Sequence, residues 1–252
     1  MITIADAALL AGAGALAGLA GTAGGITSLI SYPALLLVGL PPLTANVVNV
    51  VALVACWPGS AAASRPELRG RGPWLARWAP VAAAGGLAGA LLLLSTPPGA
   101  FARVVPFLLA AAALALLFQP RLSAWLDRRE RRAGALVLGT GLFAMSVYNG
   151  YFGAGAGVML LALMLLTTDQ HLARANALKN WLLGPASVIA AITFIVLGPV
   201  DWAAVAPLAA GMLAGGVAGP QITRRMPPGL LRWLVALTGL GVAVRLWAVP
   251  AL

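Results

Sequence analysis

The sequence predicts an all-α polytopic membrane protein, and two observations carry that prediction. Hydrophobic residues make up 61% of the 252 positions and charged residues only 9%, whereas an ordinary soluble domain has about 25% charged residues. Apolar stretches long enough to cross a bilayer, about 20 residues for roughly 30 Å of hydrocarbon, recur along the whole chain. No stretch of domain size with a soluble composition is left between them.

The expected membrane segments follow one another with short loops between them. The first, residues 1–39, and a later one, residues 133–168, are interrupted by glycines, so each is either one kinked helix or a hairpin of two. The remaining segments are continuous apolar runs of helical length. They cover residues 43–63, 78–94, 104–118, 175–197, 202–222 and 230–249.

The formal net charge of +10 comes from arginines that lie beside the apolar segments. Orientation in the membrane explains this placement better than binding to nucleic acid, so the bilayer is the expected partner and nucleic acid is not. One cysteine, Cys56, and one histidine, His171, cannot build a disulfide or a Cys/His zinc site, and we expect no cofactor. Asp169 and His171 are expected to be solvated loop residues.

The chain repeats itself after a shift of about 126 to 132 residues. "GTAGGITSL" in the first half faces "GAGAGVMLL" in the second, "TANVVN" faces "RANALK", and "PVAAAGGLAGALL" faces "PLAAGMLAGGVAG". The order of the matches is the same in both halves, which indicates a duplication. We expect a first repeat at residues 1–118, a basic cytoplasmic linker at 119–133 and a second repeat at 134–252.

The relative orientation of the repeats depends on the two glycine-broken segments. If each is one kinked helix, the chain has eight spans, the repeats are parallel, and ten arginines face one side against five. If each is a hairpin, the repeats are inverted, and thirteen arginines lie on one side of the membrane and two on the other. Because basic loops stay cytoplasmic, the hairpin arrangement is favoured. It places both termini outside and predicts re-entrant or half-depth second arms at residues 26–39 and 158–167, with three spanning helices in each repeat.

Inverted repeats with paired broken helices point to a substrate site near the interface between the repeats. In the first repeat, Gly24 and Gly25 would release the chain just before the second arm. The amide groups left without carbonyl partners would then belong to Ile26, Thr27 and Ser28. A helix start of this kind carries about half a positive charge and favours an anion.

The second repeat offers a matching helix start. Gly155 and Gly157 lie at the equivalent break, with Asn149 close by in sequence. Two such starts facing each other would form a positive pocket rich in hydrogen-bond donors. The alternative is that these glycines serve only close packing between helices.

A lysine, Lys179, lies within an expected span. On a helix it shares one face with Asn176 and Asn180, as do Asn46 and Asn49 at the equivalent positions of the first repeat. A charge at the bilayer centre costs at least about 2.5 kcal/mol and rarely faces lipid. Two interpretations stay open: the stripe donates hydrogen bonds to a small oxyanion, or Lys179 snorkels to the headgroups.

Four stretches carry a family resemblance: "GTAGGITSLISYPALLLVGLPPLTANVVN", "YNGYFGAGAGVMLLALML", "ARANALKNWLLG" and "LGPVDWAAVAPLAAGMLAGGVAGPQITRRMPPGLLRWLV". Together they resemble the TauE/SafE family, also called TSUP, from about residue 12 to residue 247. The resemblance implies a carrier of sulfite, sulfoacetate or related organosulfur anions across the bacterial inner membrane. It places the family's motifs on Gly21, Gly24, Gly25, Gly153, Gly155 and Gly157 and on Ala175, Asn176, Lys179 and Asn180. The first repeat departs from the second by having Asn49 where the second has Lys179.

Composition and resemblance together predict a multi-pass inner-membrane transporter of a small anion, a sulfur oxyanion or organosulfonate. The acidic residues fall in loops or at span ends, so no proton relay is expected. Export or facilitated flux is favoured, because an anion leaving a cell that is negative inside gains about 2.3 kcal/mol per charge per 100 mV. Coupling to sodium or protons stays open, as does a homodimer.

Two other classes of function remain as alternatives. An anion channel would use the same positive pocket. A membrane-embedded enzyme or an assembly factor has less support, because a serine nucleophile would find only Lys179 as an intramembrane base.

Overall fold

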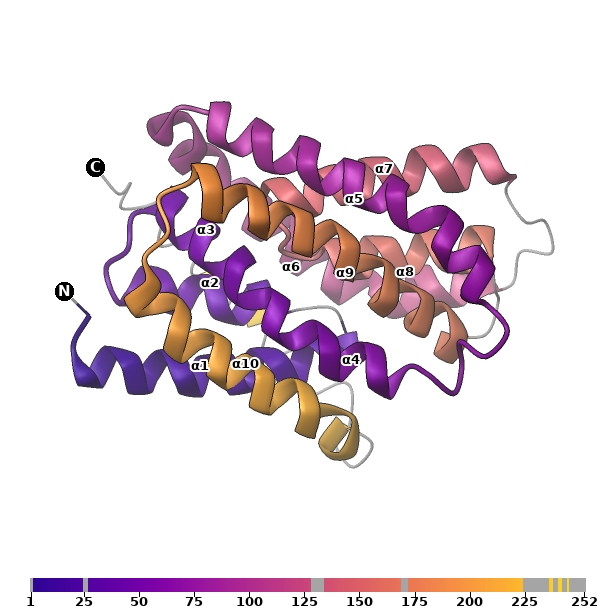
Figure 1. Cartoon of the computed structure of the whole chain (residues 1–252), viewed down its shortest axis with the longest axis horizontal. Helices are drawn as coiled ribbons and strands as arrows, with labels where there is room; N and C mark the ends of the chain where they lie inside the picture. Colours follow the sequence, from indigo (N-terminus) through magenta and orange to yellow (C-terminus); the bar gives the residue numbers. More distant parts are fainter. Residues whose placement is uncertain are drawn as a thin grey trace.

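The computed structural model describes residues 2–24, 27–127, 134–168 and 172–223, together with 236, 237, 240, 241 and 244. In the described part of the chain, every regular element is a helix, and the helices lie along a common direction in one bundle (Figure 1). The predicted loop residues Asp169 and His171 lie outside the described residues, as does most of the predicted span at 230–249.

The first helices are α1 (Ile4–Gly24), α2 (Ser28–Leu37), α3 (Pro42–Leu53), the 3-10 turn η1 (Val54–Cys56), α4 (Trp57–Ala63) and α5 (Gly72–Ser95). The later ones are α6 (Pro98–Asp127), α7 (Ala135–Tyr151), α8 (Ala156–Thr167), α9 (Leu172–Leu197) and α10 (Trp202–Thr223). Five stretches of the described residues are long and apolar enough to cross a membrane: Ile4–Gly21, Pro42–Ala62, Gly72–Ser95, Pro98–Phe118 and Ala173–Leu197. The predicted all-α polytopic membrane fold is therefore confirmed.

Local sequence explains where several helices begin. Helices α3, α4 and α5 each carry a proline in the first turn, where the missing N–H has no helical partner to lose. Helix α1 begins with a capping box: Thr3 N–H donates to the Asp6 carboxylate at 2.9 Å, and Asp6 N–H donates to the Thr3 hydroxyl at 3.2 Å. Asp201 caps α10 by accepting from the Ala203 N–H at 3.0 Å. Both acidic side chains thus lie at helix ends.

Both glycine-rich segments break into two helices, and the chain turns back at each break (Figure 1). The second break contains Gly153 and Gly155, whose φ angles of +79° and +76° fall in the left-handed region that favours glycine. Helices α2 and α8 have only 10 and 12 residues, so at 1.5 Å per residue they are about 15 and 18 Å long, too short to cross hydrocarbon. The division into two repeats and their inverted relation stay predictions.

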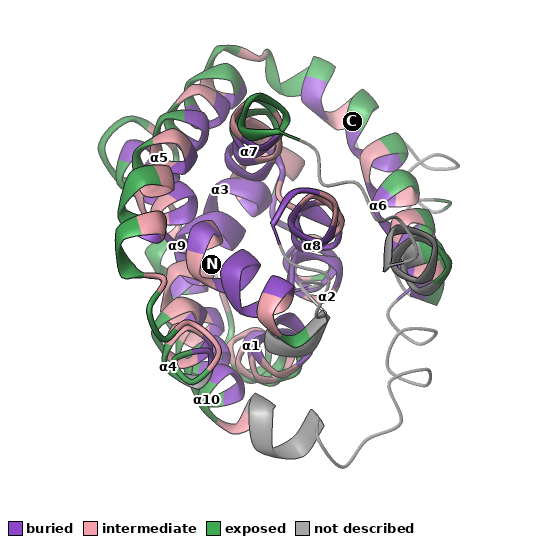
Figure 2. Ribbon diagram, turned by 90° about the vertical axis from the view of Figure 1, so that its right-hand side faces the viewer, coloured by how far each residue is buried: buried purple, intermediate pink, exposed green. Residues whose placement is uncertain are grey.

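The short helices lie in the middle of the bundle. Figure 2 shows α2, α3, α8 and α9 largely buried, whereas α1, α4, α5, α6, α7 and α10 surround them and expose their outer faces. Those outer faces carry large apolar side chains such as Leu92, Phe107 and Val217, each more than half exposed. Exposed apolar surface of this extent is typical of contact with lipid.

Small residues bring the outer helices into close contact. A Cβ added at Gly211 or Gly215 of α10 would collide with the carbonyl oxygens of Ala11 and Ala15 in α1. A Cβ at Gly85 of α5 would lie 2.6 Å from the Ser146 Cβ in α7. The "GGLAG" and "GGVAG" stretches therefore pack within the protomer, and each contact joins a helix of the first half of the chain to one of the second half.

Candidate functional site

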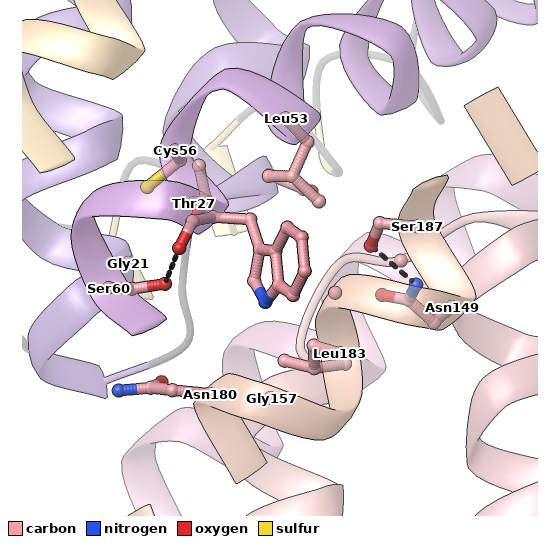
Figure 3. Close-up of a pocket in the computed structure, with 14 residues that line it drawn as sticks. Gly21, Thr27, Leu53, Cys56, Ser60, Asn149, Gly157, Asn180, Leu183 and Ser187 are labelled. Atoms are coloured by element: carbon pink, nitrogen blue, oxygen red, sulfur yellow. Dashed lines mark hydrogen bonds between the residues drawn. The ribbon is translucent and has the colours of Figure 1, made fainter. Parts of the chain in front are cut away.

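A central cavity lies between the two helix breaks (Figure 3). About 560 Å³ of it is not filled by protein atoms, and part of that space is open to solvent. Helices from both halves of the chain contribute to its wall. The lining residues are Gly21, Thr27, Ser28, Leu53, Cys56, Trp57, Ser60, Asn149, Gly153, Gly157, Asn180, Leu183, Gly184 and Ser187.

The starts of both short helices border this cavity. Thr27 and Ser28 lie at the start of α2, and Gly157 lies in the first turn of α8. The two breaks are close to each other, because a Cβ added at Gly153 would be 3.8 Å from the Ser28 hydroxyl oxygen. The first amides of a helix have no carbonyl partner within it, so both helices present the positive ends of their dipoles to the same space.

Hydroxyl and amide groups supply the polar part of the wall. Asn149 on α7 donates to the Ser187 hydroxyl on α9 at 3.1 Å, and Figure 3 shows this pair on the side of the cavity opposite Thr27, Cys56 and Ser60. Among the described residues, no acidic side chain lines the cavity. The described wall therefore offers hydrogen-bond donors and helix dipoles to a ligand without opposing negative charge.

A buried network fixes the start of α2. Asn49 on α3 donates to the Ser28 hydroxyl at 3.0 Å, and the Ser31 hydroxyl donates to the Asn49 side-chain oxygen. The Ser31 hydroxyl is also 3.0 Å from the Thr27 carbonyl. Asn49 is fully buried and does not line the cavity, so it supports the cavity wall through Ser28.

The second break is fixed by an amide from the first half of the chain. Asn46 on α3 donates to the Tyr151 carbonyl at the end of α7 at 2.8 Å, and this satisfies a carbonyl that no later turn of the helix can reach. The Tyr148 hydroxyl donates to the Ala154 carbonyl at 2.6 Å and holds the connection between α7 and α8. Asn46 is fully buried and lies outside the cavity wall.

Lys179 is fully buried, with 0% of its side chain exposed. The interpretation that it snorkels to the headgroups is therefore wrong, because a snorkelling ammonium must reach the interface. Within the described part of the chain its Nζ has no hydrogen-bond partner. Lys179 does not line the cavity itself, but it lies near Cys56, which does.

The asparagines on either side of Lys179 differ in their surroundings. Asn180 lines the cavity and donates to the Ser64 hydroxyl at 3.3 Å. Asn176 is partly buried and does not line the cavity, and its side-chain oxygen is without a partner among the described residues. The predicted helix face with Asn176, Lys179 and Asn180 is thus formed on α9, but only Asn180 lines the cavity.

Of the predicted site residues, Thr27, Ser28, Asn149, Gly157 and Asn180 line the cavity. Gly155 is the left-handed residue immediately before α8, and Gly24 is the last residue of α1. Gly25 and Ile26 lie outside the described residues. Asn46, Asn49, Asn176 and Lys179 lie around the cavity without lining it.

Sequence reasoning missed part of the wall. Trp57 and Ser60 come from α4, and Gly184 and Leu183 come from the middle of α9. The run "CWPGS" at residues 56–60 places a proline and a glycine inside an apolar span and could have marked an interruption there.

The chain is similar to a family of bacterial membrane transporters. A family model described as "Sulfite exporter TauE/SafE" matches residues 7–246. A probable membrane transporter protein, ORF9, of a Sinorhizobium species is 26% identical over 238 residues, covering 93% of this chain and 90% of that protein. The probable membrane transporter protein YfcA of Escherichia coli K12 is 26% identical over 237 residues, covering 92% and 86% of the two chains. No solved structure matches the chain significantly.

Proposed function

The chain belongs to the TauE/SafE family and is a multi-pass membrane transporter, and from this premise we propose that it carries a small anion across the bacterial inner membrane. The proposed substrate is a sulfur oxyanion or an organosulfonate, such as sulfite or sulfoacetate. The family description names sulfite, and the cavity offers the donors that such an oxyanion accepts.

One observation carries the proposal: the starts of α2 and α8 border the same cavity, together with hydroxyl and amide donors and without a carboxylate. A desolvated anion needs both hydrogen bonds and positive potential to replace its water. The helix starts supply partial positive charge, and the nearby ammonium of Lys179 supplies a full charge that lacks a partner among the described residues. An anion in the cavity would compensate that charge.

Export or facilitated flux is the proposed direction. A potential that is negative inside the cell drives an anion outward with about 2.3 kcal/mol per charge per 100 mV, so export needs no coupled ion. Asp6 and Asp201 lie at helix ends rather than in the cavity wall, and this favours a mechanism without a carboxylate as proton carrier.

The proposal is tested by flux in proteoliposomes that contain the purified full chain. We expect saturable uptake of labelled sulfite or sulfoacetate and counterflow when the same anion is present inside, whereas a channel would show neither. Lys179→Ala and Lys179→Arg should both lose most of the flux, because a planar guanidinium does not reproduce a compact ammonium. Arg103→Ala is the control, since Arg103 is exposed at the start of α6.

Two results would contradict this proposal. One is wild-type protein that moves none of a panel of sulfur oxyanions, organosulfonates, sulfate and chloride. The other is flux of the anion against an inside-negative potential that requires a sodium or proton gradient, which would reverse the proposed direction.

A further inference from the structure

A second cavity, which we call the basic vestibule, lies next to the central cavity. It holds about 900 Å³ of empty space, including open solvent, and lies between α4, α5, α9 and the loop that joins α4 to α5. Its lining residues are Trp57, Pro58, Ala61, Ala62, Arg65, Leu68, Arg69, Gly72, Leu75 and Trp181. Trp57 is the residue that both cavities share.

The vestibule carries the chemistry that attracts anions. Arg65 and Arg69 are exposed and contribute two guanidinium groups, whose planar forks match oxyanions. Glu67 lies between them in the sequence but does not line the vestibule. The vestibule lies on the side of the bundle where the arginine-rich α4–α5 loop emerges, so its positive potential concentrates anions at that end of the protein.

Trp57 is held tightly at the boundary. A Cβ added at Gly184 of α9 would overlap the Trp57 indole, so the ring lies directly against the α9 backbone. The indole Nε1–H is buried and, among the described residues, has no hydrogen-bond acceptor. A buried donor without an acceptor costs roughly 1–3 kcal/mol, and an anion that passes the ring would remove that cost.

The regular α-helix is interrupted immediately before Trp57. Residues Val54–Cys56 form a 3-10 turn in the middle of the apolar span Pro42–Ala62, and Trp57 is the first residue of α4. Pro58 follows directly, in the first turn of α4. A short 3-10 stretch inside a helix often marks a hinge, and here it lies immediately before Trp57, the residue that lines both cavities.

We propose that Trp57 is the gate between the central cavity and the basic vestibule, and that its indole N–H is the donor that passes an oxyanion from one to the other. Arg65 and Arg69 collect the anion, the hinge at η1 lets α4 move the ring away from Gly184, and the anion enters the space bordered by the starts of α2 and α8. The inference rests on the proposed anion transport, but the gate itself can be tested without transport.

Cys56 provides a natural reporter, because it is the only cysteine of the chain and lines the central cavity just beyond the gate. Purified full-length protein is treated with the anionic reagent 2-sulfonatoethyl methanethiosulfonate, and the modification rate is measured by intact mass. We expect Trp57→Ala to react about tenfold faster than the wild type or more, because removal of the ring opens the wall. Trp74→Ala, which removes an indole that lines neither cavity, should leave the rate unchanged.

The vestibule is tested in the Trp57→Ala background. Adding Arg65→Gln and Arg69→Gln should slow modification by the anionic reagent about threefold or more, but should not slow modification by the cationic trimethylammonium analogue. A Trp57→Ala rate equal to the wild-type rate would overturn the gate. If the two arginine substitutions change the Cys56 modification rate equally for the anionic and the cationic reagent, the vestibule does not collect anions. If Trp57→Ala does not elute as a monodisperse protein, Trp57→Leu takes its place in every arm.

The donor role is tested separately with Trp57→Phe. Phenylalanine retains an aromatic ring but has no N–H, so Cys56 should stay as slow to react as in the wild type while anion flux falls about fivefold or more. Unchanged flux in this variant would contradict the donor role. If the wild type itself shows no flux while the Cys56 rates follow the expected pattern, the proposed function fails and the gate stands.

Discussion

Replacing Lys179 with methionine separates a lysine that binds substrate from one that supports the fold. Lys179 is fully buried on α9, and in the described part of the chain its Nζ has no hydrogen-bond partner. Methionine has a similar length and no charge, so it fills the same space without the ammonium. If Lys179 serves to bind substrate, it should lower the free energy of unfolding of the substrate-free protein. If it serves the structure, it should raise that free energy.

The size of the effect follows from the burial. Insertion scales put the cost of a lysine at the membrane centre at about 2.5–3.5 kcal/mol, and nothing in the described surroundings of Nζ offsets it. Lys179→Met should therefore stabilise the substrate-free protein by up to about 3 kcal/mol. At about 2–4 °C per kcal/mol for a chain of this size, Tm should rise by up to about 6 to 12 °C.

The assay is thermal unfolding of detergent-solubilised protein with and without anion. In the wild type, an anion at 100 times its Kd should raise the free energy of unfolding by about 2.7 kcal/mol. In Lys179→Met the anion should not change this free energy. The control is Leu178→Met. Leu178 directly precedes Lys179 and is equally buried, so in this variant the anion should still raise Tm. A lower Tm for substrate-free Lys179→Met, or an unchanged anion response, would refute the reasoning.

Three further substitutions test the supports of the cavity. Gly155→Ala should cost roughly 1–2 kcal/mol from the positive φ alone and lower anion flux, whereas Gly99→Ala, which meets open space, should change neither Tm nor flux. Asn46→Leu should lower the free energy of unfolding by about 1–3 kcal/mol, and with it Tm, because the Tyr151 carbonyl at the end of α7 would stay buried without a donor. Gly215→Leu should abolish the recovery of monodisperse protein, because the side chain would collide with the α1 backbone. The control is Gly12→Leu, since a Cβ at Gly12 of α1 meets open space. Equal recovery of the two variants would contradict the packing of α1 against α10.

The fold class could be predicted from the sequence because composition and length decide it. A bilayer requires about 20 apolar residues per helix, and such runs are visible without knowledge of tertiary contacts. The breaks at the two glycine stretches were visible for a similar reason, since glycine interrupts helices, and at the second break Gly153 and Gly155 adopt the left-handed conformation. These features are local, so local sequence patterns report them.

The surroundings of single polar side chains could not be predicted, because they depend on which helices become neighbours. Helical spacing placed Asn46 and Asn49 on one face, but it did not show that the first would hold the Tyr151 carbonyl and the second the Ser28 hydroxyl. Their predicted contact with substrate stays a prediction. The choice between binding and snorkelling for Lys179 likewise depended on packing, and full burial decided against snorkelling.

The part of the cavity wall formed by α4 was hidden for another reason. Residues 43–63 are continuously apolar, so hydropathy shows one uniform span where the structure has α3, a 3-10 turn and α4. Pro58 alone does not reveal the turn, because a proline in the first turn of a helix costs nothing there. The gate position of Trp57 followed only from the two cavities that meet at its ring.

The contact between α1 and α10 has a consequence for biosynthesis. The small-residue surface of α1 finds its partner only when residues Trp202–Thr223 have been made, about 200 residues after α1 itself is complete. At about 5–20 residues per second, the ribosome needs roughly 10 to 40 s for that stretch. During this interval α1 rests in lipid or against the insertion machinery, so the nascent chain cannot close into its bundle until α10 has been made.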